Sequence, residues 1–187
     1  MIEIIAICGK SSSGKTTTIK EIKKILGIQA HIVKSYTTRK ERTYDPEDIN
    51  SHIFVDKEFY RDNKDKAIAI YDSPKGYHSW IDSNSFYNGI NIYAIDPKAV
   101  VNELAPYCKQ NKWKLTVFYL DVSEKERKRR YKKRENTLKG FSEEKHLDNS
   151  IFNGADVDCW SIDADASSPD DIAKVIIALT VREDKFQ

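Results

Sequence analysis

The sequence contains little cysteine and no long hydrophobic run, and both absences exclude classes of protein. Its three cysteines, Cys8, Cys108 and Cys159, are scattered and form no C-x-x-C pair, so neither a disulfide framework nor a zinc site is indicated. The longest apolar stretch, residues 4–8, is far too short to cross a bilayer, and no charged and then apolar leader precedes it. We therefore expect a cytoplasmic protein without a membrane partner.

An excess of charge of one sign is also missing. Charged residues make up 32% of the 187-residue sequence, but the formal net charge is only +2. The overall balance therefore gives no reason to expect a nucleic-acid partner. Hydrophobic residues make up 40%, an ordinary share for a globular protein, and the length suits one domain with a single core.

What the sequence does contain is a phosphate-binding loop. Residues 9–16 read G-x-x-x-x-G-K-T, after an apolar run and before an amphipathic helical pattern. Two glycines let the backbone curl around one anion, and the start of the following helix adds its positive end. The motif predicts a site for a nucleoside triphosphate; a Ser/Gly-rich turn is the alternative. The expected ligands are Gly9, Ser11, Ser12, Ser13, Gly14, Lys15, Thr16 and Thr17.

Two residues of this loop have predicted chemical roles. Lys15 is expected to reach the β- and γ-phosphates and to act in catalysis, and the Thr16 hydroxyl is expected to hold Mg²⁺. Motifs that the sequence lacks exclude other classes of protein with a phosphate-binding loop. No D-x-x-G or N-K-x-D motif is present, which excludes the guanine-nucleotide switches, and no Gly-Gly pair is present, which excludes the usual transporter ATPase signature. A small kinase remains.

Apolar runs alternate with helical patterns along most of the chain. This alternation favours an α/β fold in which a parallel sheet of about five strands is covered by helices on both faces. The expected strands are residues 2–8, 31–36, 90–95, 115–120 and, more weakly, 159–162. The expected helices are residues 16–26, 97–111 and 123–133, one that begins at Ser142, and one that begins with the cap Ser168-Pro169.

One long polar segment interrupts this alternation. Residues 37–89 contain only short β-like runs, at 53–55 and 67–71. A connection of this length is too long for an ordinary strand-to-helix loop, and such insertions are usually functional. We expect a single domain over residues 1–187, with a core at 1–36 and 90–187, an acceptor-binding insertion at 37–89 and a short lid at about 130–145.

The start of the insertion carries a second motif. Ser35-Tyr36-Thr37-Thr38-Arg39-Lys40-Glu41-Arg42, followed by acids and Phe54-Val55, resembles the nucleotide-monophosphate site of guanylate kinases, S-x-T-T-R-x-x-R. With the phosphate loop, the resemblance covers about the first hundred residues and continues weakly to about residue 150. Two arginines three apart can grip a phosphate through charge-assisted hydrogen bonds. The resemblance implies that Ser35, Arg39 and Arg42 bind the acceptor phosphate; surface salt bridges are the alternative for the two arginines.

The same resemblance implies further acceptor ligands. Asp45, or else Glu47, matches the acid after the second arginine, and His52 stands where the family has tyrosine. Tyr77 matches the turn over the acceptor nucleotide, and Asp96 ends a strand that aims a carboxylate at the metal and phosphates. Packing is the alternative for His52 and Tyr77, and a helix N-cap is the alternative for Asp96. Ile70 stands where the family has a glutamate that reads guanine, so the acceptor base stays open.

Residues 124–134 are rich in lysine and arginine. A solvated helix face, a nucleic-acid patch and a lid all fit such a run, and the lid is favoured over the other two. The resemblance implies that Arg130 and Arg134 close over the triphosphate and neutralise the migrating phosphoryl group. The family has a further arginine on the returning helix, where this chain has Lys145-His146.

These observations together predict a P-loop kinase with the three-layer fold of nucleoside monophosphate kinases. It would transfer the γ-phosphoryl group of ATP, with Mg²⁺, to a (deoxy)nucleoside monophosphate, with GMP or dGMP favoured. The alternatives are a kinase of another nucleotide, a nucleoside or a small metabolite, and a guanylate kinase-like binding module without activity. Nucleotide substrates are the expected partners, a nucleic-acid partner is the least favoured reading, and the protein is expected to be a monomer or a homodimer.

Overall fold

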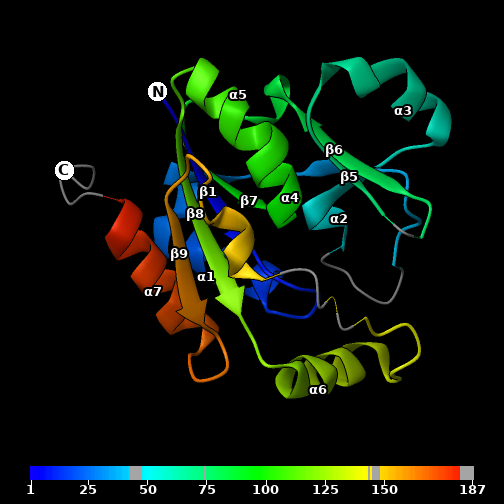
Figure 1. Cartoon of the computed structure of the whole chain (residues 1–187), viewed down its shortest axis with the longest axis vertical. Coiled ribbons are helices and arrows are strands. Elements are labelled where there is room, and N and C mark those ends of the chain that lie inside the picture. Colours follow the sequence, from blue (N-terminus) through cyan, green and yellow to red (C-terminus); the bar gives the residue numbers. More distant parts are fainter. Residues whose placement is uncertain (43–47, 74, 143, 145–147, 182–187) are drawn as a thin grey trace.

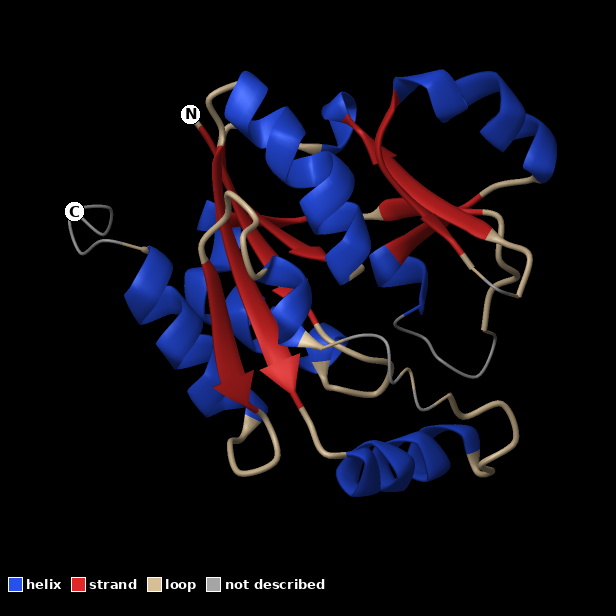
Figure 2. Cartoon of the chain, in the orientation of Figure 1, coloured by secondary structure: helices blue, strands red, loops and turns tan. Residues whose placement is uncertain are grey.

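The computed structural model describes residues 1–42, 48–73, 75–142, 144 and 148–181. At its centre is a five-stranded parallel sheet with the order β2-β7-β1-β8-β9 (Figure 1, Figure 2). This sheet confirms the predicted α/β fold and the expected number of strands. The strands are β1 (Ile2–Cys8), β2 (Ala30–Ile32), β7 (Gly89–Ala94), β8 (Lys114–Asp121) and β9 (Cys159–Asp163).

Strand β1 lies in the middle of the sheet because its side chains are apolar on both faces. Ile4, Ala6 and Cys8 belong to one core cluster, and Ile5 and Ile7 belong to the other. One group of helices contributes to each cluster, which gives three layers. The first cluster is covered by α4 (Pro97–Ala99), a π-helical turn (Val100–Leu104) and α5 (Ala105–Gln110), and the second by α1 (Lys15–Leu26) and α7 (Pro169–Thr180).

The insertion forms a second, four-stranded sheet with the order β4-β3-β6-β5. Trp80 is buried at its centre and stacks on Tyr36, with 5.4 Å between ring centroids, while Tyr60 packs against the same indole at 4.9 Å. Ala69 and Ile81 join the first core cluster, so the insertion shares its packing with the central domain. Its elements are β3 (Ser35–Thr37), α2 (Asp48–Ser51), β4 (His52–Phe54), α3 (Lys57–Asn63), β5 (Ala67–Asp72) and β6 (His78–Asp82).

Two predicted elements differ from the structure. The single strand expected at 31–36 is two strands, because the chain leaves the central sheet after Ile32 and enters the second sheet at Ser35. The insertion sheet therefore begins two residues before the predicted boundary. The helix expected to begin at Ser142 is not formed at residues 142 and 144, because the backbone of Glu144 is left-handed, with φ 48°.

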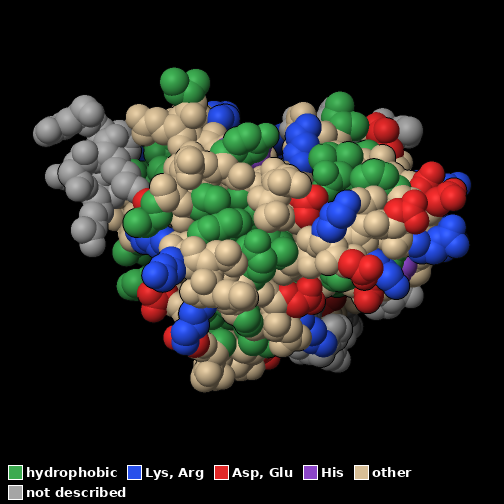
Figure 3. All heavy atoms as spheres, turned by 90° about the horizontal axis from the view of Figure 1, so that it is seen from above, with side chains coloured by type: hydrophobic (Ala, Val, Ile, Leu, Met, Phe, Trp, Pro, Cys, Tyr) green, Lys and Arg blue, Asp and Glu red, His purple; other side chains and the backbone are tan. Residues whose placement is uncertain are grey.

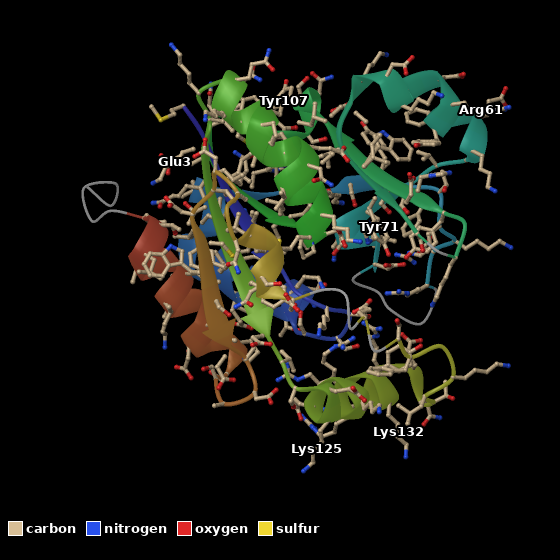
Figure 4. The ribbon with its side chains drawn as sticks, viewed as in Figure 1. Glu3, Arg61, Tyr71, Tyr107, Lys125 and Lys132 are labelled. Atoms are coloured by element: carbon tan, nitrogen blue, oxygen red, sulfur yellow. The ribbon has the colours of Figure 1, made fainter. Side chains whose placement is uncertain are left out.

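Helix α6 (Glu124–Glu135) lies beyond the carboxyl ends of the strands, at the lower edge of the molecule in Figure 1. Its N-cap Ser123 accepts a hydrogen bond from the Glu126 N–H, as the sequence pattern predicts. Lys125 and Lys132 point away from the body of the molecule (Figure 4), so part of the basic run is a solvated face. Figure 3 shows acidic and basic side chains intermixed over the right-hand part of another face. Among the described residues no helix is long and apolar enough to cross a membrane.

Candidate active site

The phosphate loop connects β1 to α1 and is tightly curled. Gly9 and Gly14 have φ of 140° and 106°, and a Cβ atom on Gly9 would lie 2.9 Å from the Leu120 carbonyl oxygen. Ser12 also adopts a positive φ, 63°, which is uncommon for a residue other than glycine. The hydroxyl oxygens of Ser12 and Ser13 are buried without a hydrogen-bond partner within the described structure. Such orphaned donors, together with the glycine geometry, suit a loop that holds a polar ligand.

Lys15 begins α1 and folds back over the loop. Its Nζ donates to the carbonyl oxygens of Gly9, at 2.7 Å, and Lys10, at 3.0 Å. Burial lowers the pKa of the ammonium, and the negative charges of Glu144 and Asp96 oppose that shift. The adjacent Thr16 side chain is exposed at the start of the helix. The Lys15 ammonium therefore lies against the carbonyl oxygens of the loop, and the Thr16 side chain is exposed where the helix begins.

Arg127 on α6 contacts the same loop, and the sequence analysis did not assign it a role. The side chain is only 1% exposed. Its Nε donates to the Ser11 carbonyl oxygen at 2.9 Å, and its Nη2 donates to Ser142 O and Glu144 Oε2, both at 2.9 Å. Glu144 Oε2 also accepts the Ser11 N–H at 2.7 Å. The helical spacing of Arg127 with Arg130 was the available sequence signal for its position, whereas nothing pointed to Glu144.

The two predicted lid arginines lie in different surroundings. Arg130 donates to Ser13 O in the loop, at 2.9 Å, and to Ala164 O beyond β9, at 2.7 Å. Arg134 instead pairs with Glu135 at 2.8 Å and lies over the Tyr131 ring. The structure thus brings Arg130 to the loop, while the described contacts of Arg134 stay within α6. The catalytic roles of both remain predictions, and His146 lies outside the described residues.

Four of the predicted acceptor ligands lie together in the insertion. Because β3 and β4 are parallel with Ser35 opposite His52, the Ser35 Oγ and His52 Nδ1 atoms come within 2.8 Å. Arg39 and Arg42 both act electrostatically on the same imidazole. Burial lowers the pKa of His52, and the charges of Arg39 and Arg42 lower it as well against the opposite effect of Asp48, which leaves it at about 4. At neutral pH the ring is therefore uncharged beside two guanidinium groups.

Asp48 organises this acceptor cluster, and the sequence analysis missed it. Its carboxylate accepts two hydrogen bonds from the Arg39 guanidinium, at 2.9 and 2.6 Å, and one from the Arg42 backbone N–H at 2.8 Å. The residue is only 4% exposed. Burial alone would raise the pKa of this carboxyl, but the hydrogen bonds from Arg39 and Arg42 hold it below its usual value. Asp45 and Glu47 lie outside the described residues.

The remaining predicted residues lie where the insertion meets the core. Asp96 caps the helix after β7, since its Oδ1 accepts the Lys98 N–H at 2.8 Å, and its charge acts on both Lys15 and Tyr71. Tyr77 packs near Tyr71, with 6.3 Å between ring centroids. Figure 4 labels Tyr71 between the insertion and the core. The helix-cap alternative for Asp96 therefore holds, and the charge of the same carboxylate also acts on one residue of the phosphate loop and on one of the insertion.

A family comparison matches residues 5–148 to AAA_18, described as an AAA domain. The chain belongs to this family. Among curated proteins, none matches it.

Solved structures resemble this AAA_18 chain over most of its length. A guanylate kinase from Anaplasma phagocytophilum is 15% identical, with a TM-score of 0.59 over 97% of this chain and 88% of that one. The protein APE1195 is also 15% identical, with a TM-score of 0.51 over 95% and 94%. A gluconokinase from Sinorhizobium meliloti 1021 is 12% identical, with a TM-score of 0.44 over 94% and 90%. The likeness to the guanylate kinase, together with the family match, shows that the AAA_18 chain has the P-loop kinase fold.

We expect Gly9→Ala to lower stability and to abolish ATP binding. The added Cβ would sit 2.9 Å from the rigid Leu120 carbonyl, in a backbone conformation that costs about 1–3 kcal/mol for a residue with a side chain. Urea unfolding and calorimetric ATP titration measure the two effects. Gly154→Ala is the matched control, because Gly154 has φ 78° but open space around it. Equal stability of the two variants would contradict the steric role of Gly9.

We expect acid to destabilise the protein through His52. The folded-state pKa of about 4 lies below the unfolded value of about 6.5, so below pH 6.5 the unfolded chain binds a proton that the folded chain refuses. The free energy of unfolding should therefore fall by about 3 kcal/mol between pH 6.5 and pH 4, with no contribution from this group above pH 6.5. His52→Gln should remove that part of the slope in urea unfolding measured across this range. An unchanged slope would show that His52 titrates normally.

Proposed function

We propose that the protein is an ATP-dependent phosphotransferase that moves the γ-phosphoryl group of ATP to the phosphate of a nucleoside monophosphate, with GMP and dGMP as the favoured acceptors. One observation carries the proposal. Asp96 follows β7, and its charge acts on both the Lys15 ammonium of the phosphate loop and Tyr71 of the insertion. A phosphate loop and an insertion that both experience the charge of one strand-end carboxylate support the transfer of a phosphoryl group between two phosphates.

The donor half of the proposed site is the loop with Arg130. The backbone amides of residues 12–16 and the Lys15 ammonium would hold the triphosphate, and Arg130 is already anchored to the loop through Ser13 O. Catalysis would come from positioning and charge neutralisation, without a covalent intermediate. The donor half needs no strong base, because the acceptor phosphate is itself the nucleophile.

Magnesium fits the oxygen ligands at this site. The exposed Thr16 hydroxyl and the Asp96 carboxylate would hold the ion, which supplies charge neutralisation of the phosphates when bound. Within the described residues no group of three or more His, Cys, Asp or Glu side chains could hold a metal by itself. That arrangement suits Mg²⁺ in kinases, which is usually held by one or two protein oxygens together with phosphates and water.

The acceptor half is the cluster around Asp48. Two arginines share this one carboxylate and the imidazole is neutral, so the cluster of Arg39, Arg42, His52 and Asp48 keeps a net positive charge. The two hydrogen bonds to Asp48 also hold the Arg39 guanidinium against the Phe54 ring, 5.5 Å from its centroid, so the position of this cation in the cluster is fixed. A phosphate oxygen is the ligand that such a cluster would attract.

A second candidate acceptor is a different nucleotide, a nucleoside or a small metabolite. The side chain of Ile70 offers no hydrogen bond to a base, and its backbone N–H is occupied by Glu103 Oε2 at 2.7 Å. A site that reads guanine through a carboxylate at this position is therefore not formed by Ile70 itself. This observation favours the second candidate, whereas the preference for GMP and dGMP rests on the resemblance of the phosphate loop and the Ser35–Arg42 segment to guanylate kinases.

A panel of acceptors with Mg²⁺ and ATP tests the proposal. We expect phosphoryl transfer to at least one nucleoside monophosphate, detected as its diphosphate by chromatography. Lys15→Ala should lower kcat/KM by about a hundredfold or more, because it removes a cation that acts on the migrating group. Lys24→Ala, an exposed lysine on the same helix, is the matched control.

The outcomes separate the alternatives. Turnover of a nucleoside or metabolite alone would replace the monophosphate proposal with the second candidate. ATP binding without turnover of any acceptor would instead indicate a binding module. Full activity of Lys15→Ala on an accepted substrate would overturn the mechanism.

A further inference from the structure

A single carboxylate oxygen occupies an anion position on the phosphate loop. Glu144 Oε2 accepts the Ser11 N–H at 2.7 Å and the Arg127 Nη2 at 2.9 Å. The charge of Glu144 also acts on the Lys15 ammonium. A loop amide, a guanidinium and an ammonium are the donors that bind a phosphate oxygen in kinases. In this structure two of these donors, the Ser11 amide and the Arg127 guanidinium, bind the Glu144 carboxylate, whose charge also acts on the third.

The side chain of Arg127 is buried, although charged side chains are rarely buried unless they are paired. Its side chain is 1% exposed and that of Glu144 is 20% exposed. A buried guanidinium is costly unless a counter-charge and hydrogen bonds accompany it. Here Ser11 O, Ser142 O and the Glu144 carboxylate supply them, and the Phe141 ring lies 5.2 Å from the guanidinium carbon. The Glu144 carboxylate thus holds the Arg127 guanidinium at the loop. Another anion, such as a phosphate oxygen, could take the place of this carboxylate.

The charge of the Glu144 carboxylate also reaches the insertion. Its charge acts on Tyr71 in the insertion as well as on Lys15. A phosphoryl group that leaves the donor must lie between the loop and the acceptor, in line with both. Glu144 thus lies against the Ser11 amide of the loop and acts on Lys15, the residue expected to reach the β- and γ-phosphates, which suits the terminal end of a bound triphosphate.

We propose that Arg127 binds an oxygen of the γ-phosphoryl group of ATP, and that Glu144 holds this place in the nucleotide-free protein. Triphosphate binding then exchanges one anionic partner of Arg127 for another. No covalent bond is made or broken in this step. The inference rests on the proposed function only in requiring that the loop binds ATP, and it holds whichever acceptor is used. Its consequence is that Glu144 opposes ATP more strongly than ADP, which lacks the γ-phosphoryl group.

Calorimetric titration of the full chain with ATP and with ADP, each with Mg²⁺, tests the exchange. Glu144→Gln keeps the shape and an acceptor oxygen but removes the competing charge. We expect it to tighten ATP binding by about fivefold to tenfold and to leave ADP binding within about twofold. Glu124→Gln on α6 makes the same change of charge at an exposed residue paired with Lys128, and it should change neither affinity.

Arg127→Lys provides the opposite test. It keeps a positive charge but loses the fork that contacts both Ser11 O and the anion, so ATP binding should weaken by about tenfold while ADP binding changes less. A purely structural role would weaken both nucleotides equally. Thermal midpoints measured without nucleotide establish that each variant is folded, and Glu144→Gln carries the test if Arg127→Lys does not fold.

The results distinguish this inference from the proposed function. An unchanged ATP-to-ADP affinity ratio in Glu144→Gln, or weaker ATP binding, would overturn the exchange while leaving phosphoryl transfer intact. Absence of ATP and ADP binding in the unmodified protein would overturn the proposed function and the inference together. Exchange with the expected ratio but no turnover of any acceptor would support the inference and reject the kinase.

Discussion

Strand β1 is hydrogen-bonded to β7 on one side and to β8 on the other, and its side chains are buried on both faces. This double burial keeps the strand in the middle of the sheet. Parallel strands end at the same edge, so the loop after β1 opens beside the ends of β7 and β8. Asp96 then follows β7, and α6 with its arginines follows β8. The arrangement of the whole site depends on the central place of one apolar strand.

In both halves of the site a carboxylate neutralises an arginine that is largely shielded from solvent. Each half contains an arginine that is mostly or fully removed from solvent, and each arginine is paired with a carboxylate: Arg39 with Asp48, and Arg127 with Glu144. A cation left unpaired in such a position would cost several kcal/mol. The protein therefore carries internal anions at places where it is proposed to bind phosphate. The two pairs differ in burial, because Asp48 is almost fully buried whereas Glu144 is partly exposed.

Local patterns were sufficient for much of the fold. The strands at 90–95 and 115–120, the cap of α6 and the Ser168-Pro169 start of α7 agree with the structure to within one or two residues, because each depends on neighbours in the chain. The prediction of a single strand at 31–36 was wrong, since apolar periodicity does not show which of two sheets a residue joins. Strand β6 was not predicted at all. It is held by pairing with β3, which is distant in sequence, by pairing with the neighbouring β5, and by the burial of its own Trp80.

By itself the sequence determined the phosphate loop, the parallel α/β sheet and the presence of a second group of arginines, because these follow from glycine geometry, apolar runs and the spacing of charged residues. Only the tertiary structure decided which charges meet. Asp48 stands nine residues after its partner Arg39, and Glu144 stands on a segment that contacts Ser11 across 133 residues. Long-range ion pairs of this kind have no local pattern, since their energy depends on burial and geometry that the folded chain alone provides.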